Sequence, residues 1–222
     1  MRPRVVAVDG PAGAGKSSAS RALAARLGFA HVDTGAMYRV VGVLAQERGI
    51  APDDATALGV LVRDLEIGFA GAAVLAGGRD LTEAIRRPDA GEWASRVSAQ
   101  PVVRERLVAL QRALGARGAV VMEGRDIGTV VFPDAPVKFF LTAEPAERAR
   151  RRAAELRARG EAVDEPALAR EIAERDRRDA GRAHSPLRAA PDAVVIDTTP
   201  LALERVVDQM EEVARARGVG RS

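Results

Sequence analysis

Residues 5–17 have the sequence VVAVDGPAGAGKS, which carries the strongest fold signal in the chain. It opens with four consecutive apolar residues, as expected for a buried strand of a parallel sheet. Residues 10–17 then match the pattern G-x-x-x-x-G-K-[ST] in full, and the pattern that follows predicts a helix over residues 16–27 that Gly28 ends. A strand, a glycine-rich turn and a helix in this order predict the start of an α/β sheet.

Four further short segments are candidate strands of the same sheet. Three of them are apolar runs, and the fourth directly follows the helix stop at Gly28; they are residues 31–33, 119–122, 137–141 and 193–196. Helical patterns separate most of them, as expected when parallel strands are joined by crossover helices. We therefore predict a three-layer α/β sandwich around a five-stranded parallel sheet.

Two segments interrupt this alternation. After Gly35 the sequence predicts a helix over 37–48, a polar turn at 52–54 and glycine-rich alternating segments around 66–76, which indicates an inserted lobe. From Glu147 to about Arg182 it predicts two arginine-rich helices divided at Gly160, the second starting near Asp164 and Pro166. The expected division is a core of residues 1–37, 112–146 and 183–222, a lobe of residues 38–111 and a lid of residues 147–182. A final helix is expected over 201–216.

Composition narrows the classes of protein. The 222 residues are 47% hydrophobic, enough for a sizeable core, and 34 basic residues are nearly balanced by 31 acidic ones, so a nucleic-acid coat protein is not indicated. There is no cysteine, which excludes disulfides, thiolate metal ligands and cysteine nucleophiles. No apolar run approaches the length of a membrane span. We expect a cytoplasmic protein that binds neither nucleic acid nor membrane.

The glycine-rich loop has the chemistry of a polyphosphate site. Its glycines allow successive backbone N–H groups to point inward, and the helix N-terminus adds partial positive charge. Lys16 would neutralise the β- and γ-phosphates of a bound ATP, and the Ser17 hydroxyl would ligate Mg²⁺. The expected donor-binding residues are Gly10, Pro11, Ala12, Gly13, Ala14, Gly15, Lys16, Ser17 and Ser18. This motif predicts a fold like that of the P-loop NTPases.

Further polar clusters point to a second anionic substrate. Asp33-Thr34-Gly35 with Arg39, and residues 123–126 (EGRD), each follow a predicted strand. In open α/β sheets, ligands bind at the carboxyl ends of the strands. The chain contains no asparagine and therefore no N-K-x-D guanine-reading motif of ordinary GTPase switches. A kinase with two closing insertions that exclude water is the interpretation that uses all these features.

The residues also carry a family resemblance. Asp9-Gly10-Pro11 before the phosphate loop, DTGAMYR at 33–39, EGRDIGTVVFPDA at 123–135 and ERDRRD at 174–179 together resemble the bacterial cytidylate kinases. The resemblance covers nearly the whole chain. It implies a monomeric nucleoside-monophosphate kinase that uses ATP and Mg²⁺ to phosphorylate CMP or dCMP.

The resemblance also implies residue roles. Thr34, Arg39 and Arg125 would hold the acceptor phosphate, while Ser95, Arg104 and Asp126 would read cytosine. Arg175 and Asp179 would meet the sugar hydroxyls, and Arg182 would support Asp179. A lid arginine, among Arg148, Arg151 and Arg152, would stabilise the transferring phosphoryl group. With Lys16, the expected catalytic residues are Arg125, Asp126, Arg148 and Arg151. Glu123 stands where the family usually has Asp, which leaves its role toward the metal open.

Other interpretations remain. The chain could be a P-loop kinase for UMP, AMP or a sugar-like acid, or an ATP-hydrolysing regulatory protein whose arginines contact RNA. Asp33 and Asp126 could be strand-end caps, and residues 148–152 a solvated helix face. His31 and His184 are expected to be structural, because neither has a carboxylate and a nucleophile arranged near it in the sequence, nor the spacing of metal ligands. We further expect Arg125→Ala to lower turnover strongly while leaving the thermal midpoint nearly unchanged.

Overall fold

The computed structural model describes residues 4–71, 73–182 and 185–220. The chain divides into two compact units, one of residues 1–31 and 118–222 and the other of residues 32–117. Each unit has its own cluster of buried apolar side chains. The second unit extends a few residues beyond the lobe expected at 38–111 on each side, so its boundaries differ from the expected ones.

The first unit is organised around the expected five-stranded parallel sheet. Its strands are β1 (Val5–Asp9), β2 (Ala30–Asp33), β6 (Val120–Gly124), β7 (Val137–Thr142) and β8 (Val194–Asp197), in the order β2-β6-β1-β7-β8. Strand β1 pairs in parallel with both β6 and β7, so that Val8 lies opposite Glu123 on one side and Phe139 on the other. All five strands fall within two residues of the predicted segments. The chain passes from the first unit to the second within β2.

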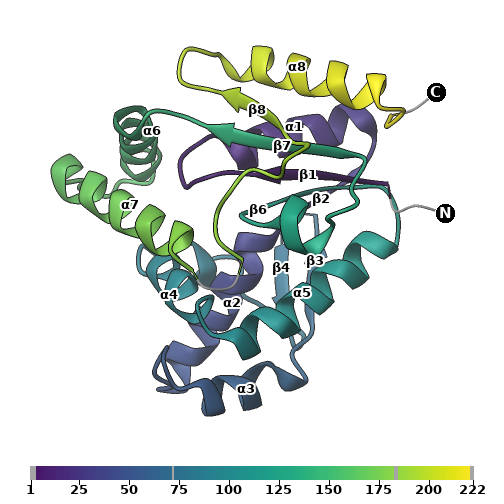
Figure 1. Ribbon diagram of the computed structural model, residues 1–222. Helices are drawn as coiled ribbons and strands as arrows, with labels where there is room; N and C mark the ends of the chain where they lie inside the picture. The colour runs from purple at the N-terminus through teal and green to yellow at the C-terminus, as the bar shows by residue number, and fades with distance from the viewer. Residues whose placement is uncertain (1–3, 72, 183–184, 221–222) are drawn as a thin grey trace. The chain divides into compact units, whose positions relative to one another are not determined.

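Two helices cover one face of this sheet. Helix α1 (Lys16–Leu27) and helix α8 (Leu203–Ala216) lie side by side and contact the strands beneath them (Figure 1). Leu23, Phe139 and Met210 are fully buried in this layer, and each such side chain contributes about 1.5–3 kcal/mol through removal from water. The α8 helix begins two residues later than expected, because Thr199 first forms a turn in which its N–H and hydroxyl both donate to Asp197 Oδ1.

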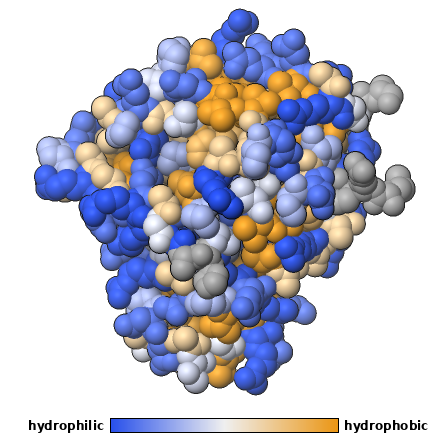
Figure 2. Space-filling view, viewed as in Figure 1, coloured by the Kyte–Doolittle hydropathy of each residue, from blue (hydrophilic) through white to orange (hydrophobic). Residues whose placement is uncertain are grey.

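The arginine-rich segment forms the two predicted helices, α6 (Pro145–Arg157) and α7 (Glu165–Ala180), which pack against each other. Asp164 caps α7, with its Oδ1 accepting from the Ala167 N–H at 3.1 Å. Only Ile172 and Asp179 of α7 are buried, and Figure 2 shows a mostly hydrophilic surface over this helix. Its packing therefore depends more on polar contacts than on an apolar core.

The second unit combines helices with a small antiparallel sheet. Helices α2 (Thr34–Glu47), α3 (Ala55–Arg63), α4 (Ala90–Val97) and α5 (Pro101–Ala116) enclose the apolar cluster, with a 3-10 turn η1 (Ala84–Arg86). The strands are β3 (Ile67–Ala70), β4 (Ala73–Ala76) and β5 (Arg79–Asp80). Helix α2 starts three residues earlier than expected, because Asp33 accepts from the Ala36 N–H and caps it. Thr34 and Gly35 therefore belong to a helical turn and not to a loop.

Within the described ranges, none of the helices combines the length and apolar character needed to cross a bilayer.

Candidate active site

The glycine-rich loop of residues 10–15 joins β1 to α1 and leaves the start of the helix open. Gly15, with φ of 81°, adopts the left-handed conformation just before the helix. In the described structure no side chain caps α1, and its first turn has no acidic residue. Ser17 and Ser18 are exposed. The first N–H groups of the helix and the positive end of its dipole are therefore available to an anion.

Lys16 is buried at this loop and is 6% exposed. Its ammonium donates to the Pro11 carbonyl oxygen at 2.6 Å. Burial, together with the positive charge of Arg125, lowers the pKa of Lys16 to about 7. A bound polyphosphate would relieve both effects by supplying negative charge. The electrostatics of the loop thus favour an anionic ligand.

The Ser17 hydroxyl contacts strand β6. It donates to Glu123 Oε2 at 2.8 Å, and His31 Nε2 lies 3.0 Å from Glu123 Oε1. The partner of His31 is therefore a carboxylate 92 positions away in the sequence. No sequence signal near His31 indicated this contact, because it depends on the order of the strands, in which β2 lies next to β6. His184 lies outside the described residues.

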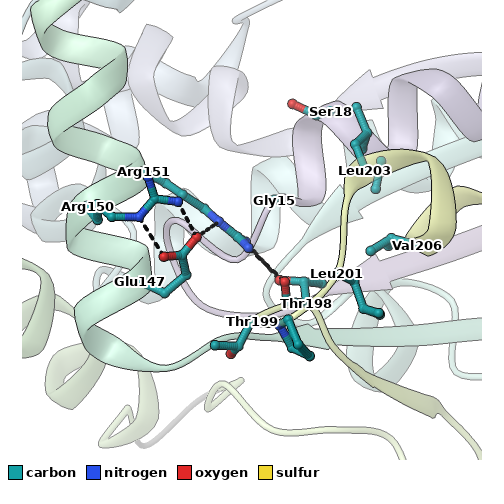
Figure 3. A pocket seen from close by; sticks show the side chains of 12 residues that line it. Gly15, Ser18, Glu147, Arg150, Arg151, Thr198, Thr199, Leu201, Leu203 and Val206 are labelled. Atoms are coloured by element: carbon teal, nitrogen blue, oxygen red, sulfur yellow. Dashed lines mark hydrogen bonds and ion pairs between the residues drawn. The ribbon is translucent and has the colours of Figure 1, made fainter.

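A cavity of about 420 Å³ opens beside the end of the phosphate loop. It is lined by Gly15 and Ser18, by α6 residues that include Glu147 and Arg151, and by the segment after β8 that begins at Thr198. Figure 3 shows Arg151 held between Glu147 and Thr198, with hydrogen bonds of 2.7 Å and 2.9 Å. The cavity has both apolar and polar walls, as small-molecule sites usually do.

The arginines of α6 have different positions. Arg148 is buried, with its guanidinium donating to the Ala143 and Ala12 carbonyl oxygens at 3.1 Å each and pairing with Asp176 at 2.6 Å. Arg150 and Arg151 both line the cavity, although the Arg150 side chain is 67% exposed. Arg152 pairs with Glu155. Arg148, which is 6% exposed, therefore does not lie on a solvated helix face. Arg148 instead ties α6 to the phosphate loop.

Three arginines surround Asp179 near the end of α7. Arg125 Nε and Arg182 Nη2 lie 3.0 Å and 2.6 Å from its oxygens, and Arg175 Nε lies 4.0 Å away. Asp179 is 1% exposed. Burial alone would raise the pKa of Asp179, but the arginines, led by Arg125, outweigh it and hold that pKa below its usual value. Three guanidinium groups around one carboxylate leave a surplus of positive charge.

The loop that carries Arg125 and Asp126 is fixed by a buried carboxylate. Asp9, at the end of β1, accepts from the N–H groups of Ile127 and Gly128 at 2.9 Å and 2.8 Å. These residues begin a short π-helical turn, η2 (Ile127–Val131). Burial raises the pKa of Asp9 to about 7 despite these hydrogen bonds. Asp9 entered the sequence analysis only as part of a motif, and its anchoring role depends on a residue 119 positions away.

The second unit holds the remaining predicted site residues. Arg39 Nη2 lies 2.6 Å from Asp33 Oδ2, so Asp33 both caps α2 and orients the arginine. Ser95 and Arg104 are buried, and the Arg104 guanidinium lies 5.7 Å from the centre of the Tyr38 ring. The Ser95 hydroxyl has no hydrogen-bond partner within the described structure. A buried hydroxyl without a partner is unusual and suits a ligand contact.

A family model described as cytidylate kinase matches residues 6–216. The chain belongs to the cytidylate kinase family. The cytidylate kinase of Geobacter sulfurreducens is 51% identical over 220 residues, which cover 97% of this chain and 94% of that protein. The cytidylate kinase of Solibacter usitatus is 46% identical over 96% of this chain and 93% of its own. A bifunctional pantoate ligase/cytidylate kinase of Synechococcus elongatus is 50% identical over the whole chain, which spans 44% of that protein.

Solved structures agree on the fold. A Thermus thermophilus protein superposes with a TM-score of 0.53 at 19% identity, covering 99% of this chain and 100% of its own. A protein from Eubacterium ventriosum superposes with a TM-score of 0.51 at 12% identity, covering 96% and 98% of the two chains. At such low identity these likenesses support the α/β fold and no particular activity.

The predicted site residues of this cytidylate kinase family member fall into two groups. In the first unit, Arg148 and Arg151 lie beside the phosphate loop. The same unit contains a separate cluster around Asp179, made of Arg125, Arg175 and Arg182. Asp126 follows Arg125 in the chain. The second unit contains Thr34, Arg39, Ser95 and Arg104. The roles of all these residues toward substrates stay predictions.

Proposed function

We propose that this protein is a phosphotransferase that moves the γ-phosphoryl group of ATP to CMP or dCMP and releases ADP with CDP or dCDP. The observation that carries the proposal is a complete phosphate loop in a chain that matches the cytidylate kinase family from residue 6 to residue 216. The surplus positive charge around Asp179 supports a second anionic substrate.

The donor nucleotide would occupy the phosphate loop and the cavity next to it. Backbone N–H groups at the start of α1 and the Lys16 ammonium would bind the polyphosphate, and residues 10–18 would line it. The cavity beside Gly15 and Arg151 has room for the base of ATP. Leu201 and Val206 of the cavity wall offer apolar contact to the base.

The residues at Ser17 fit Mg²⁺. Ser17 provides a hydroxyl oxygen and Glu123 a carboxylate, both hard oxygen donors, and Mg²⁺ in kinases is held by few protein groups together with the substrate phosphates. We propose Ser17 as the direct protein ligand. When bound, Mg²⁺ would offset the charge of the donor phosphates.

The acceptor roles follow the family pattern. Thr34, Arg39 and Arg125 would bind the phosphate of CMP, because paired arginines form charge-assisted hydrogen bonds with phosphate oxygens. Ser95, Arg104 and Asp126 would recognise cytosine through the amino, ring-nitrogen and carbonyl positions. Arg175 and Asp179 would contact the sugar, and Arg182, 2.6 Å from Asp179, would hold that carboxylate in place.

The reaction would be a direct in-line transfer without a covalent enzyme intermediate. An oxygen of the acceptor phosphate attacks the γ-phosphorus, a new P–O bond forms, and the bond to the β–γ bridging oxygen breaks so that ADP leaves with that electron pair. Catalysis would come from positioning and from cations around the transferring group, with Lys16 and Arg151 on the donor side and Arg125 on the acceptor side. Arg148 would act indirectly, since its contacts hold the Ala12 carbonyl of the phosphate loop.

Coupled ADP release with MgATP and a panel of CMP, dCMP, UMP and AMP tests this function. We expect kcat/KM for CMP or dCMP to exceed that for AMP by at least two orders of magnitude. A preference for UMP or AMP would instead identify another nucleoside-monophosphate kinase. ATP hydrolysis that no monophosphate stimulates, together with salt-sensitive RNA binding, would favour the regulatory RNA-binding alternative. We further propose that the enzyme acts as a monomer in the cytoplasm, which sedimentation and cell fractionation test.

A further inference from the structure

The contact between Ser17 and Glu123 extends to a third residue. Glu123 lies in β6 and is 3% exposed; its Oε2 accepts from the Ser17 hydroxyl at 2.8 Å, and its Oε1 lies 3.0 Å from His31 Nε2. Ser17 is in the first turn of α1, and His31 is in β2, the neighbour of β6 in the sheet. All three residues belong to the first unit. Two separate elements thus hold the two oxygens of one buried carboxylate.

The direction of the hydrogen bonds follows from the groups involved. A carboxylate only accepts, so the Ser17 proton points to Glu123, and the His31 proton must sit on Nε2. A serine hydroxyl has one proton and two lone pairs. When its proton is directed into the protein, both lone pairs are free for a cation on the solvent side, where Ser17 is exposed. Glu123 therefore orients the hydroxyl as a ligand for a cation.

Glu123 needs a second hydrogen-bond partner to keep the Ser17 hydroxyl in one orientation. A glutamate side chain has three rotatable bonds, and fixing them costs conformational entropy. A single hydrogen bond to Ser17 would allow the carboxylate to turn about its own axis. The bond from His31 to the other oxygen fixes the carboxylate plane, as outer partners of metal-site residues commonly do.

We propose that His31 is a positioning residue for the donor side of the active site, which it serves by fixing Glu123 so that Ser17 presents its lone pairs to the cation of the donor nucleotide. The inference rests on the proposed function, because it requires a nucleotide bound with a divalent cation. The alternative is that His31 only fastens β2 to β6. That role would affect stability but not the cation dependence of nucleotide binding.

The test is calorimetric binding of the non-hydrolysable analogue AMP-PNP, in the presence of Mg²⁺ or of EDTA. His31→Phe keeps a ring but removes both ring nitrogens. We expect it to reduce the Mg²⁺-dependent gain in affinity by about 10- to 100-fold, the usual effect of losing an outer partner, with little change in the affinity measured in EDTA. His31→Gln, whose amide can donate to Glu123, should recover most of the gain. If His31→Phe fails to fold, His31→Leu takes its place in the same measurement.

A double-mutant cycle distinguishes an effect of His31 through Glu123 from a general loss of nucleotide affinity. If His31 acts through Glu123, His31→Phe should add almost nothing to the loss already caused by Glu123→Gln. Arg26→Leu is the matched control, because Arg26 also anchors α1 through carboxylates, Asp208 and Glu211 of α8, but at the other end of the helix. It should lower stability and leave the Mg²⁺-dependent gain unchanged.

Three results would overturn the proposal. They are an unaltered Mg²⁺-dependent gain in His31→Phe, additive losses in the cycle, and an equal loss of affinity with Mg²⁺ and with EDTA. The binding assay contains no CMP. A protein that keeps the predicted His31 effect but phosphorylates no CMP would therefore contradict the proposed acceptor and leave the role of His31 standing.

Discussion

Arg125 Nε lies 3.0 Å from Asp179 Oδ2, and this contact joins the loop after β6 to the end of α7. Asp179 is 2% exposed at its side chain and Arg125 19%, so the arginine also has a face left for a ligand. From the sequence, Arg125 was expected to bind the acceptor phosphate and to take part in catalysis. The structure gives it a second role, as a partner of a buried carboxylate.

Arg125→Ala should therefore affect both activity and stability. We expect turnover to fall by at least two orders of magnitude and the free energy of unfolding to fall by about 1–3 kcal/mol, because Asp179 loses a charged partner but keeps Arg182. This corrects the expectation of an unchanged thermal midpoint. Steady-state kinetics and urea unfolding check it, with Arg215→Ala, which breaks an exposed pair with Glu211, as the control expected to change neither by much. Normal turnover per folded molecule would contradict the assignment.

Ser95→Ala should leave stability unchanged or slightly improved. The Ser95 hydroxyl is buried without a partner, so its removal costs no hydrogen bond in the free enzyme. The KM for CMP should rise and the preference for CMP over UMP should shrink. The control is Ser98→Ala, which loses the bond from Ser98 to the Ser95 carbonyl oxygen and should cost about 0.5–1.5 kcal/mol. A destabilised Ser95→Ala with an unchanged KM would show that the hydroxyl is purely structural.

Asp33→Asn separates capping from arginine positioning. Asparagine caps a helix about as well as aspartate, but it loses the ion pair with Arg39. We expect stability to change by less than about 1 kcal/mol and the KM for the acceptor to rise several-fold. Asp54→Asn is the matched control, since Asp54 caps α3 in the same unit by accepting from the Ala57 N–H. A lower KM in Asp33→Asn would mean that Asp33 competes with the acceptor phosphate for Arg39.

Gly13→Ala should disrupt the phosphate loop through α6. Gly13 has φ of +77°, and an added Cβ would lie 2.9 Å from the Arg148 Cβ and 3.0 Å from its carbonyl oxygen. Gly160 has a similar φ of +80° with nothing within 4 Å, so Gly160→Ala measures the backbone strain alone, about 1–2 kcal/mol. We expect Gly13→Ala to be more destabilising and to weaken donor binding at least tenfold. Equal losses of stability in the two variants would show that Arg148 moves aside freely.

Asp9→Asn should change how stability depends on pH. Burial raises the pKa of Asp9 from 3.8 to about 7, so between these values the folded protein binds more protons here than the unfolded chain. This group therefore makes stability fall as the pH rises through that window, by up to about 1.4 kcal/mol per pH unit. The variant lacks this slope. It is also less stable, because a side-chain NH2 group that cannot accept replaces one of the two oxygens that accept from the Ile127 and Gly128 N–H groups. Urea unfolding from pH 4 to 8 gives the difference between the two proteins, and parallel curves would contradict the shift.

Local patterns account for the parts of the fold that were predicted well. The strand, loop and helix of residues 5–27 follow from an apolar run, a glycine pattern and a helix stop, all read within one short window. Helix α7 was predicted from Asp164 and Pro166 for the same reason. The start of α2 was missed, because whether Asp33 ends a strand or caps a helix depends on the direction of its side chain, which sequence spacing does not specify.

The class of sheet, the phosphate loop with Lys16 and Ser17, and the resemblance to cytidylate kinases could all be predicted from the sequence, because they depend on residue types at fixed short spacings. Three contacts are visible only in the folded chain: Arg148 with the phosphate loop, Asp9 with the residues after Asp126, and His31 with Glu123. These contacts join positions 92 to 136 residues apart. Folding sets such distances through the order and register of the strands, and no local pattern in the chain encodes them.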